Sequence, residues 1–341
     1  MKGLVYHGEK KLRWEEVPDP EIGEDQLLVE CRAVGVCGSD LHGYLGLTGR
    51  RIPPMIMGHE FSGVVRQTGK KVKRFAPGDR VCVQPIQFCG TCAFCSQGFQ
   101  NICPNKKILG VMDFDGAMAE LVAVNEDHAF GLAEGVSFAD GSMVEPFSVT
   151  HAAVKQAPDL RGKNVAIVGA GTIGLCLLQF VVMGKPRRII ATDLSENRLS
   201  IAGDLGAHTL VNPGQEDAVK AVLEATDGMG ADIVFEAVGE SPTARQSIDL
   251  AKIRGRIVWI GNSAKMVEID MQKVVTTELN IQGSYGFTTE TFKETLALMN
   301  AGKLRAERII SMKQPLSEGA AVFEKMLREK DRYIKAILVS D

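Results

Sequence analysis

The sequence predicts an α/β protein with two domains, a β-barrel-like domain and a doubly wound parallel sheet. Short β-branched or alternating runs, divided by Gly and Pro turns, fill residues 1–150. Apolar strands then alternate with helical segments over residues 151–286, which is typical of a parallel sheet covered by helices. We therefore expect one domain at 151–286 and the other at 1–150 and 287–341, because the last segment resembles a helix and a strand returning to the first domain.

Length and composition limit the class of protein. The chain has 341 residues, enough for two cores, and its 45% hydrophobic and 24% charged residues are ordinary globular values. A net charge of −3 argues against nucleic-acid binding, which normally needs a basic excess. The N-terminus has no apolar signal core, and the longest apolar run, 173–183, is about half of a membrane span. We expect a cytoplasmic protein with neither nucleic-acid nor membrane partners.

In the first domain, the expected strands carry candidate functional side chains in the loops between them. The strands are expected at 27–34, 60–66, 79–83 and 116–124, and no long helix is expected. A cluster at Cys37, Ser39 and His42 is followed by His59 and Glu60. An intracellular cysteine beside such groups is more often a metal or catalytic ligand than half of a disulfide. Taken alone, the cluster is equally compatible with a buried structural cysteine and an unrelated histidine.

Other cysteines form a tight group in the same domain. Their spacing is C-x2-C-x2-C-x7-C, formed by Cys89, Cys92, Cys95 and Cys103. Thiolate ligands with no open position are typical of a structural zinc site. An iron–sulfur cluster uses the same ligands, and two disulfides are a further alternative. The remaining cysteines, Cys31, Cys82 and Cys176, lie in apolar settings and are expected in the core.

The second domain begins with a dinucleotide-binding pattern. An apolar strand at 165–168 leads into Gly169, Gly171 and Gly174 of a GxGxxG sequence, and a helix follows at 175–183. The next strand, 188–192, ends at Asp193, which can accept from adenosine ribose hydroxyls. The carboxylate disfavours a 2′-phosphate, so NAD is expected rather than NADP, although Arg198 nearby weakens this preference.

Further positions of this domain are candidates for the cofactor site. Thr172 and Ile173 open the helix whose N-terminus would face the pyrophosphate. Strands are also expected at 208–211, 231–238, 256–261 and 279–284, with helices at 216–225 and 243–252, which makes a sheet of six strands. Val238, Gly261 and Ser284 lie at the ends of these strands, where they would line the cofactor crevice. For Gly261, simple strand termination is an equally good interpretation.

The motifs, in their order, resemble those of the zinc-dependent medium-chain alcohol and polyol dehydrogenases. The resemblance rests on residues 35–42, 58–60, the cysteine group and residues 169–174. Glu145-Pro-Phe-Ser-Val is similar to the polyol branch that includes sorbitol dehydrogenase. The resemblance implies a GroES-like catalytic domain, a Rossmann NAD-binding domain, two zinc ions per chain and a homotetramer.

The resemblance also implies roles for individual residues. Cys37 and His59 would be zinc ligands, with Glu60, Glu145, or each in turn as the third ligand, and Asp40 would orient His59. Ser39 would take the proton of the substrate hydroxyl and pass it through the nicotinamide ribose to His42.

The implied reaction is hydride transfer from a secondary alcohol of a polyol, sugar acid or sugar derivative to NAD⁺. Sorbitol dehydrogenases carry an arginine near the substrate, where this chain has Gly283-Ser-Tyr-Gly-Phe. This difference disfavours sorbitol itself and leaves threonine-type, butanediol, sugar-acid and sugar-phosphate substrates open. Other hypotheses are a zinc-free quinone-type reductase, which needs no ligands at these positions, and a non-enzymatic nucleotide-binding protein. We expect Arg50 and Arg51 to form a solvated loop pair.

Overall fold

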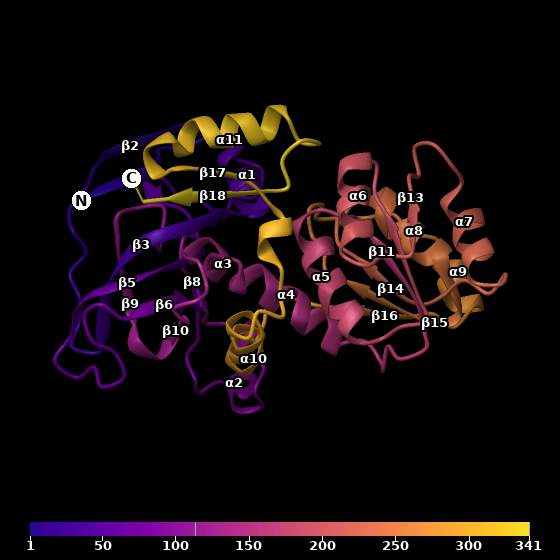
Figure 1. Cartoon of the computed structure of the whole chain (residues 1–341), viewed down its shortest axis with the longest axis horizontal. Helices are drawn as coiled ribbons and strands as arrows, with labels where there is room; N and C mark the ends of the chain where they lie inside the picture. Colours follow the sequence, from indigo (N-terminus) through magenta and orange to yellow (C-terminus); the bar gives the residue numbers. More distant parts are fainter. Residues whose placement is uncertain (113, 341) are drawn as a thin grey trace. The chain divides into compact units, whose positions relative to one another are not determined.

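The computed structural model describes residues 1–112 and 114–340. The chain divides into two compact units, labelled by element in Figure 1. The first unit comprises Met1–Glu145 and Thr288–Asp341, and the second comprises Pro146–Phe287.

The first unit is built on antiparallel strands. Its main sheet has the order β10-β6-β5-β3-β18-β17, with β9 also paired to β3, and smaller sheets are formed by β2-β1-β4 and by β7-β8. The strands are β1 (Lys2–Tyr6), β2 (Leu12–Glu16), β3 (Gln26–Val36), β4 (Met55–Ile56), β5 (Glu60–Thr68), β6 (Arg80–Val83), β7 (Ile86–Gln87), β8 (Lys107–Ile108), β9 (Leu121–Asn125), β10 (Ala129–Gly131), β17 (Ile310–Pro315) and β18 (Lys335–Val339). The strand expected at 116–124 begins only at Leu121, and β1 and β2 were not expected.

The last strand of the chain lies inside this sheet. β18 pairs antiparallel with β3 and parallel with β17, so the yellow end of the chain lies beside the indigo β3 in Figure 1. α11 (Gly319–Arg328) packs Val322 and Phe323 into the same core as Leu4 and Val29 of the N-terminal strands. The predicted helix and returning strand are therefore confirmed.

Helices connect the strands of the first unit. Besides α11, they include α1 (Gly38–Tyr44), α2 (Ala93–Ser96), α3 (Phe138–Ser142) and α10 (Thr289–Asn300). The expectation of no long helix before residue 150 was wrong, because α4 (Val144–Lys155) begins there with an apolar, largely buried sequence.

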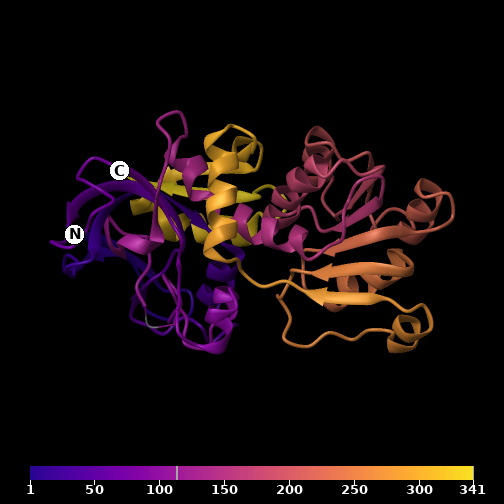
Figure 2. The ribbon, with the colours of Figure 1, turned by 90° about the horizontal axis from the view of Figure 1, so that it is seen from below.

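The second unit is a doubly wound parallel sheet. In the described chain its six strands run in the order β13-β12-β11-β14-β15-β16, and Figure 2 shows strands of this unit side by side. They are β11 (Asn164–Val168), β12 (Arg188–Thr192), β13 (Thr209–Val211), β14 (Ala231–Glu236), β15 (Ala251–Trp259) and β16 (Asn280–Gly283). The helices are α5 (Thr172–Met183), α6 (Glu196–Asp204), α7 (Ala218–Ala225), α8 (Ser241–Leu250) and α9 (Met271–Thr276). Every residue of β11 is buried, as expected for a central parallel strand covered on both faces.

No helix of the described chain is long and apolar enough to cross a membrane.

Candidate active site and metal centres

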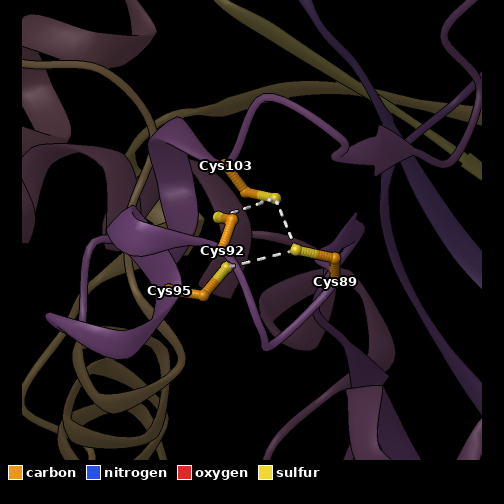
Figure 3. A group of neighbouring side chains, drawn as sticks. All are labelled: Cys89, Cys92, Cys95 and Cys103. Carbon is orange, nitrogen blue, oxygen red and sulfur yellow. Dashed lines mark hydrogen bonds between the residues drawn. The ribbon is translucent and has the colours of Figure 1, made fainter.

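The cysteine group converges on one point of the first unit. Cys92 precedes the short helix α2, Cys95 lies within it, and the four side chains turn toward one another in Figure 3. The sulfur–sulfur distances are 4.0 Å for Cys89–Cys95, 3.8 Å for Cys92–Cys103 and 3.6 Å for Cys89–Cys103. Thiolates that bind one zinc ion tetrahedrally at about 2.3 Å would lie about 3.8 Å apart. The group therefore fits a single zinc ion.

The other interpretations of this group fit less well. A disulfide needs a sulfur–sulfur distance of about 2.05 Å, and all eight cysteines are free thiols in the described chain. An iron–sulfur cluster places several atoms between its thiolates, which needs more room than these distances leave. Backbone N–H groups of Thr91 and Cys92 are the largest causes that lower the pKa of Cys89 to about 5, which favours the thiolate that binds metal.

A second set of metal-competent side chains lies in the same unit. One ligand atom from each of Cys37, His59 and Glu60 lies within 4.8 Å of the other two. Cys37 precedes α1, His59 precedes β5 and Glu60 is the first residue of β5, so the starts of two elements bring the three together. The sulfur, nitrogen and oxygen donors with an open position are typical of catalytic zinc.

Glu60 is held by a cation that the sequence analysis missed. Its Oε2 accepts a hydrogen bond from Lys335 Nζ, and both side chains are about 2% exposed. Lys335 also donates to the carbonyl oxygen of Val36 at 3.1 Å. The ion pair of Glu60 and Lys335 lies against Gly35 of β3, where a Cβ atom would overlap the Glu60 carboxylate. A basic residue in an otherwise apolar C-terminal strand was the available signal.

Asp40 connects the candidate ligands to the loop beyond α1. Its Oδ2 accepts from the backbone N–H of Cys37 at 3.1 Å, and its Oδ1 accepts from Arg51 at 2.8 Å. The same Oδ1 lies 3.6 Å from Nδ1 of His59, which is longer than a hydrogen bond. Nδ1 of His59 is buried and has no hydrogen-bond partner in the described chain. A metal on the other ring nitrogen would leave this N–H available to Asp40.

The expectation that Arg50 and Arg51 form a solvated pair was wrong for one of them. Arg50 is exposed, whereas Arg51 is only 7% exposed. Arg51 is buried because it forms an ion pair with the buried Asp40 carboxylate, which needs a compensating charge.

Burial opposes the ionisation of two candidate metal ligands. Desolvation, followed by the charge of Glu60, raises the pKa of Cys37 to about 11. Desolvation also raises the pKa of Glu145 to about 8, although the charge of His59 acts to lower this pKa. Glu145 is buried at the start of α4 and lies outside the group of mutually close ligand atoms. A divalent cation would favour the ionised form of each group.

The expected proton carriers both lie on α1. Ser39 is exposed in its first turn, and His42 is partly buried in its last turn. Residues three apart on a helix lie on the same side, so the two side chains are neighbours on α1.

The glycine loop of the second unit has the form that a dinucleotide requires. A Cβ atom at Gly174 would overlap the carbonyl oxygen of Gly169, so the glycine lets α5 approach β11 closely. Gly171 has no heavy atom of the described chain within 4 Å of its Cβ position, which leaves room for a ligand. Thr172 and Ile173 begin α5 and are partly buried.

The acidic residue after β12 lies beside this loop. Asp193 accepts from the backbone N–H groups of Ala170 at 2.7 Å and Ser195 at 2.9 Å, and Arg198 lies 3.8 Å from its carboxylate. These contacts fix a carboxylate next to the glycine loop, as recognition of a ribose would require.

The other cofactor candidates border the ends of β14, β15 and β16. Val238 packs on the glycine loop, because a Cβ atom at Gly169 would lie 2.5 Å from Val238 Cγ2. A Cβ atom at Gly261 would overlap the backbone N–H of Gly239, so this glycine has a packing role. Ser284 is partly buried and donates its backbone N–H to Trp259 at 2.8 Å. Glu236 was missed, although its buried carboxylate accepts from the N–H groups of Val238 and Gly239.

Both halves of the chain match known families. Residues 23–134 match the family described as "Alcohol dehydrogenase GroES-like domain", and residues 172–301 match "Zinc-binding dehydrogenase". The sorbitol dehydrogenase of Bacillus subtilis is 30% identical over 99% of this chain and 97% of its own length. The chain belongs to the zinc-dependent medium-chain dehydrogenases.

Other relatives of this dehydrogenase act on phosphorylated polyols, as their names state. The D-arabitol-phosphate dehydrogenase of Enterococcus avium is 31% identical over 100% of this chain and 98% of its own. The crystal structure of galactitol-1-phosphate dehydrogenase from Escherichia coli superposes with a TM-score of 0.92 at 27% identity, covering 99% of this chain and 100% of that one. The predicted fold class, a GroES-like domain with a Rossmann domain, is confirmed.

Proposed function

We propose that this dehydrogenase oxidises a secondary alcohol of a polyol, sugar acid or sugar derivative, with zinc and NAD⁺ as cofactors. The observation that carries the proposal is the convergence of Cys37, His59 and Glu60, with sulfur, nitrogen and oxygen donors, in a chain of this family. Zinc would supply a Lewis acid for the substrate hydroxyl, and NAD⁺ would accept the hydride.

The residues of the chain then have distinct tasks. Cys37 and His59 hold the metal, and Glu60 or Glu145 completes its protein ligands. Ser39 accepts the proton of the substrate hydroxyl, and it must relay the proton because a serine does not hold a charge near neutral pH. His42 releases the proton to solvent.

A metal count combined with turnover tests this proposal. Purified protein should contain two zinc ions per chain and reduce NAD⁺ with a polyol. Cys37→Ser should lower the zinc content to one and abolish turnover while circular dichroism stays unchanged, whereas Cys31→Ser, in the core, should keep both zinc ions if it folds. One metal per chain in the wild type, insensitive to Cys37→Ser, would contradict the catalytic zinc site.

The substrate requires a panel of candidate alcohols. Relatives named for sorbitol, D-arabitol phosphate and galactitol 1-phosphate support a polyol or its phosphate. NADH formation should be followed with polyols, aldonates and sugar phosphates, and with L-threonine and butanediol as the alternative class. If kcat/KM is highest with L-threonine or butanediol, the assignment of a polyol substrate is rejected in favour of that alcohol.

NAD is proposed as the cofactor because Asp193, held beside the glycine loop, would present its carboxylate to the 2′-phosphate of NADP. Arg198 lies close to Asp193 and partly compensates the negative charge of its carboxylate. Comparing kcat/KM for NAD⁺ and NADP⁺ tests the preference, and a higher value for NADP⁺ would reject it.

We also propose a cytoplasmic homotetramer. Free thiols throughout the described chain suit a reducing compartment. β16 ends the order of its sheet, and exposed Met271 and Val275 lie on the helix before it, which suits association between copies. Light scattering that gives a monomer mass, or recovery of the protein outside the cytoplasmic fraction, would reject the corresponding part.

A further inference from the structure

Arg51 is a buried cation that the proposed reaction does not yet use. Its Nη2 atom lies 2.8 Å from Oδ1 of Asp40 and 3.4 Å from Oγ of Ser39. Its Nη1 atom donates to the carbonyl oxygen of Arg50 at 3.2 Å. One guanidinium nitrogen thus reaches both the carboxylate beside His59 and the hydroxyl expected to take the substrate proton.

We propose that Arg51 is a positioning residue of the proton relay, which holds Ser39 as an acceptor and Asp40 in place beside His59. This inference rests on the proposed function, because it assigns a role within the same reaction. Arg51 has donors and no acceptor, so Ser39 must accept from it. The hydroxyl proton of Ser39 then points elsewhere, and its second lone pair stays available for the proton of the substrate.

Arg51 also acts on the metal side of the site through Asp40. The carboxylate is fully buried and accepts from Cys37 N–H with one oxygen and from Arg51 with the other. The oxygen that binds Arg51 is the one 3.6 Å from His59 Nδ1. Arg51 therefore fixes the distance between this oxygen and the imidazole, and the charge of the guanidinium makes the buried carboxylate tolerable.

The local sequence provides space for this arginine. The backbone of α1 at Gly43 lies under the arginine stem, and a Cβ atom there would be 2.5 Å from Arg51 Cγ. Gly43 is helical, so an alanine would suit its backbone and would meet only the arginine stem among the nearest atoms. Gly43→Ala is thus a second way to displace the guanidinium without changing its chemistry.

The test compares Arg51→Lys with Arg50→Lys, the same change at the exposed neighbour. Lysine keeps the positive charge, but its single ammonium nitrogen lacks the second donor that anchors the guanidinium group to the carbonyl oxygen of Arg50. Arg51→Lys should keep two zinc ions and the fold, and should lower kcat about 10- to 100-fold, the scale expected for a misplaced catalytic group. KM should change less than about threefold, because the relay acts after binding. Gly43→Ala should show the same pattern, and Arg50→Lys should match the wild type.

A second measurement does not depend on turnover. Co²⁺ replaces the zinc, and the visible spectrum of the four-cysteine site, measured in Cys37→Ser protein, is subtracted. Arg51→Lys should shift the remaining ligand-field bands, because His59 loses its fixed partner. The proposal is overturned if metal-loaded Arg51→Lys has the same spectrum and the same kcat as the wild type. A lower melting temperature of the variant would not change this conclusion. If the wild type oxidises no alcohol, the proposed function fails, and the spectrum alone still decides whether Arg51 positions His59.

Discussion

Lys335 compensates the negative charge on one side of the candidate zinc site. Desolvation alone would lower the pKa of its ammonium group, but Glu60, Cys37 and Glu145 together hold the pKa above its ordinary value. The ammonium group is therefore charged at neutral pH, and its bond to Glu60 occupies a carboxylate oxygen that a metal could otherwise bind. Glu60 must exchange this contact for the metal if it is to act as a ligand through the same oxygen.

Removing the ammonium group of Lys335 should destabilise the first unit. Lys335→Met leaves the buried Glu60 carboxylate without its partner, and breaking such a pair costs about 3–5 kcal/mol. Glu60→Gln combined with Lys335→Met should recover most of this loss, because no buried charge remains. Lys313→Met, on the exposed face of β17, is the matched control and should change little. Urea unfolding measures the stability of all three variants. Equal stabilities of Lys335→Met and the double variant would reject the coupling between Glu60 and Lys335.

At the scale of single residues, the sequence indicated the candidate ligands but not the cations that lie beside them. Cys37, His59 and Glu60 belong to short local motifs, so their chemistry is legible from neighbouring residues. Lys335 and Arg51 become partners of the site only because β18 lies beside β3 and because Arg51 folds back over α1. Such contacts depend on tertiary structure, and no spacing rule in the sequence encodes them.

Among the elements, the turn from β11 into α5 assigns different tasks to its glycines. Gly174 permits close packing of helix and strand, whereas Gly171 faces open space. Gly174 therefore has a packing role, whereas Gly171 is a candidate for ligand binding.

Alanine substitutions at these two glycines should have different effects. Gly174→Ala forces its methyl group against the Gly169 carbonyl and should lower stability by about 1–3 kcal/mol or more. Gly171→Ala should fold normally and weaken NAD⁺ binding, since the methyl group occupies the space left for the pyrophosphate. Thermal melting and fluorescence titration with NADH distinguish the two. Unchanged NADH affinity in Gly171→Ala would show that the dinucleotide does not pass over this residue.

Elements with strong periodicity were predicted more accurately than short ones. β12 has the bounds expected from its apolar run, and the expected sheet of six strands is confirmed in the described chain. β15 begins at Ala251 rather than near 256, because its first residues continue in extended form directly after α8. β4 and β7 contain two residues each, too few to produce an alternating pattern.

At the scale of the whole molecule, the first unit is closed by segments from both ends of the chain. β18 connects β3 to β17, and its Ala336 and Leu338 belong to the same core as Leu4 and Val29. β18 also carries Lys335 to Glu60, so the strand contributes to the sheet and to the candidate site together. The second unit obtains its sheet entirely from residues 146–287.

Truncation of the last strand should therefore affect the two units differently. A chain that ends at Ile334 loses the pairing partner of β3 and β17 and leaves Glu60 without Lys335, so the first unit should unfold or aggregate and release its zinc. The second unit keeps all of its strands and should still bind NADH. A chain that ends at Val339 retains β18 and is the matched control. Zinc analysis and NADH fluorescence measure the two effects, and two bound zinc ions in the chain that ends at Ile334 would contradict the role assigned to β18.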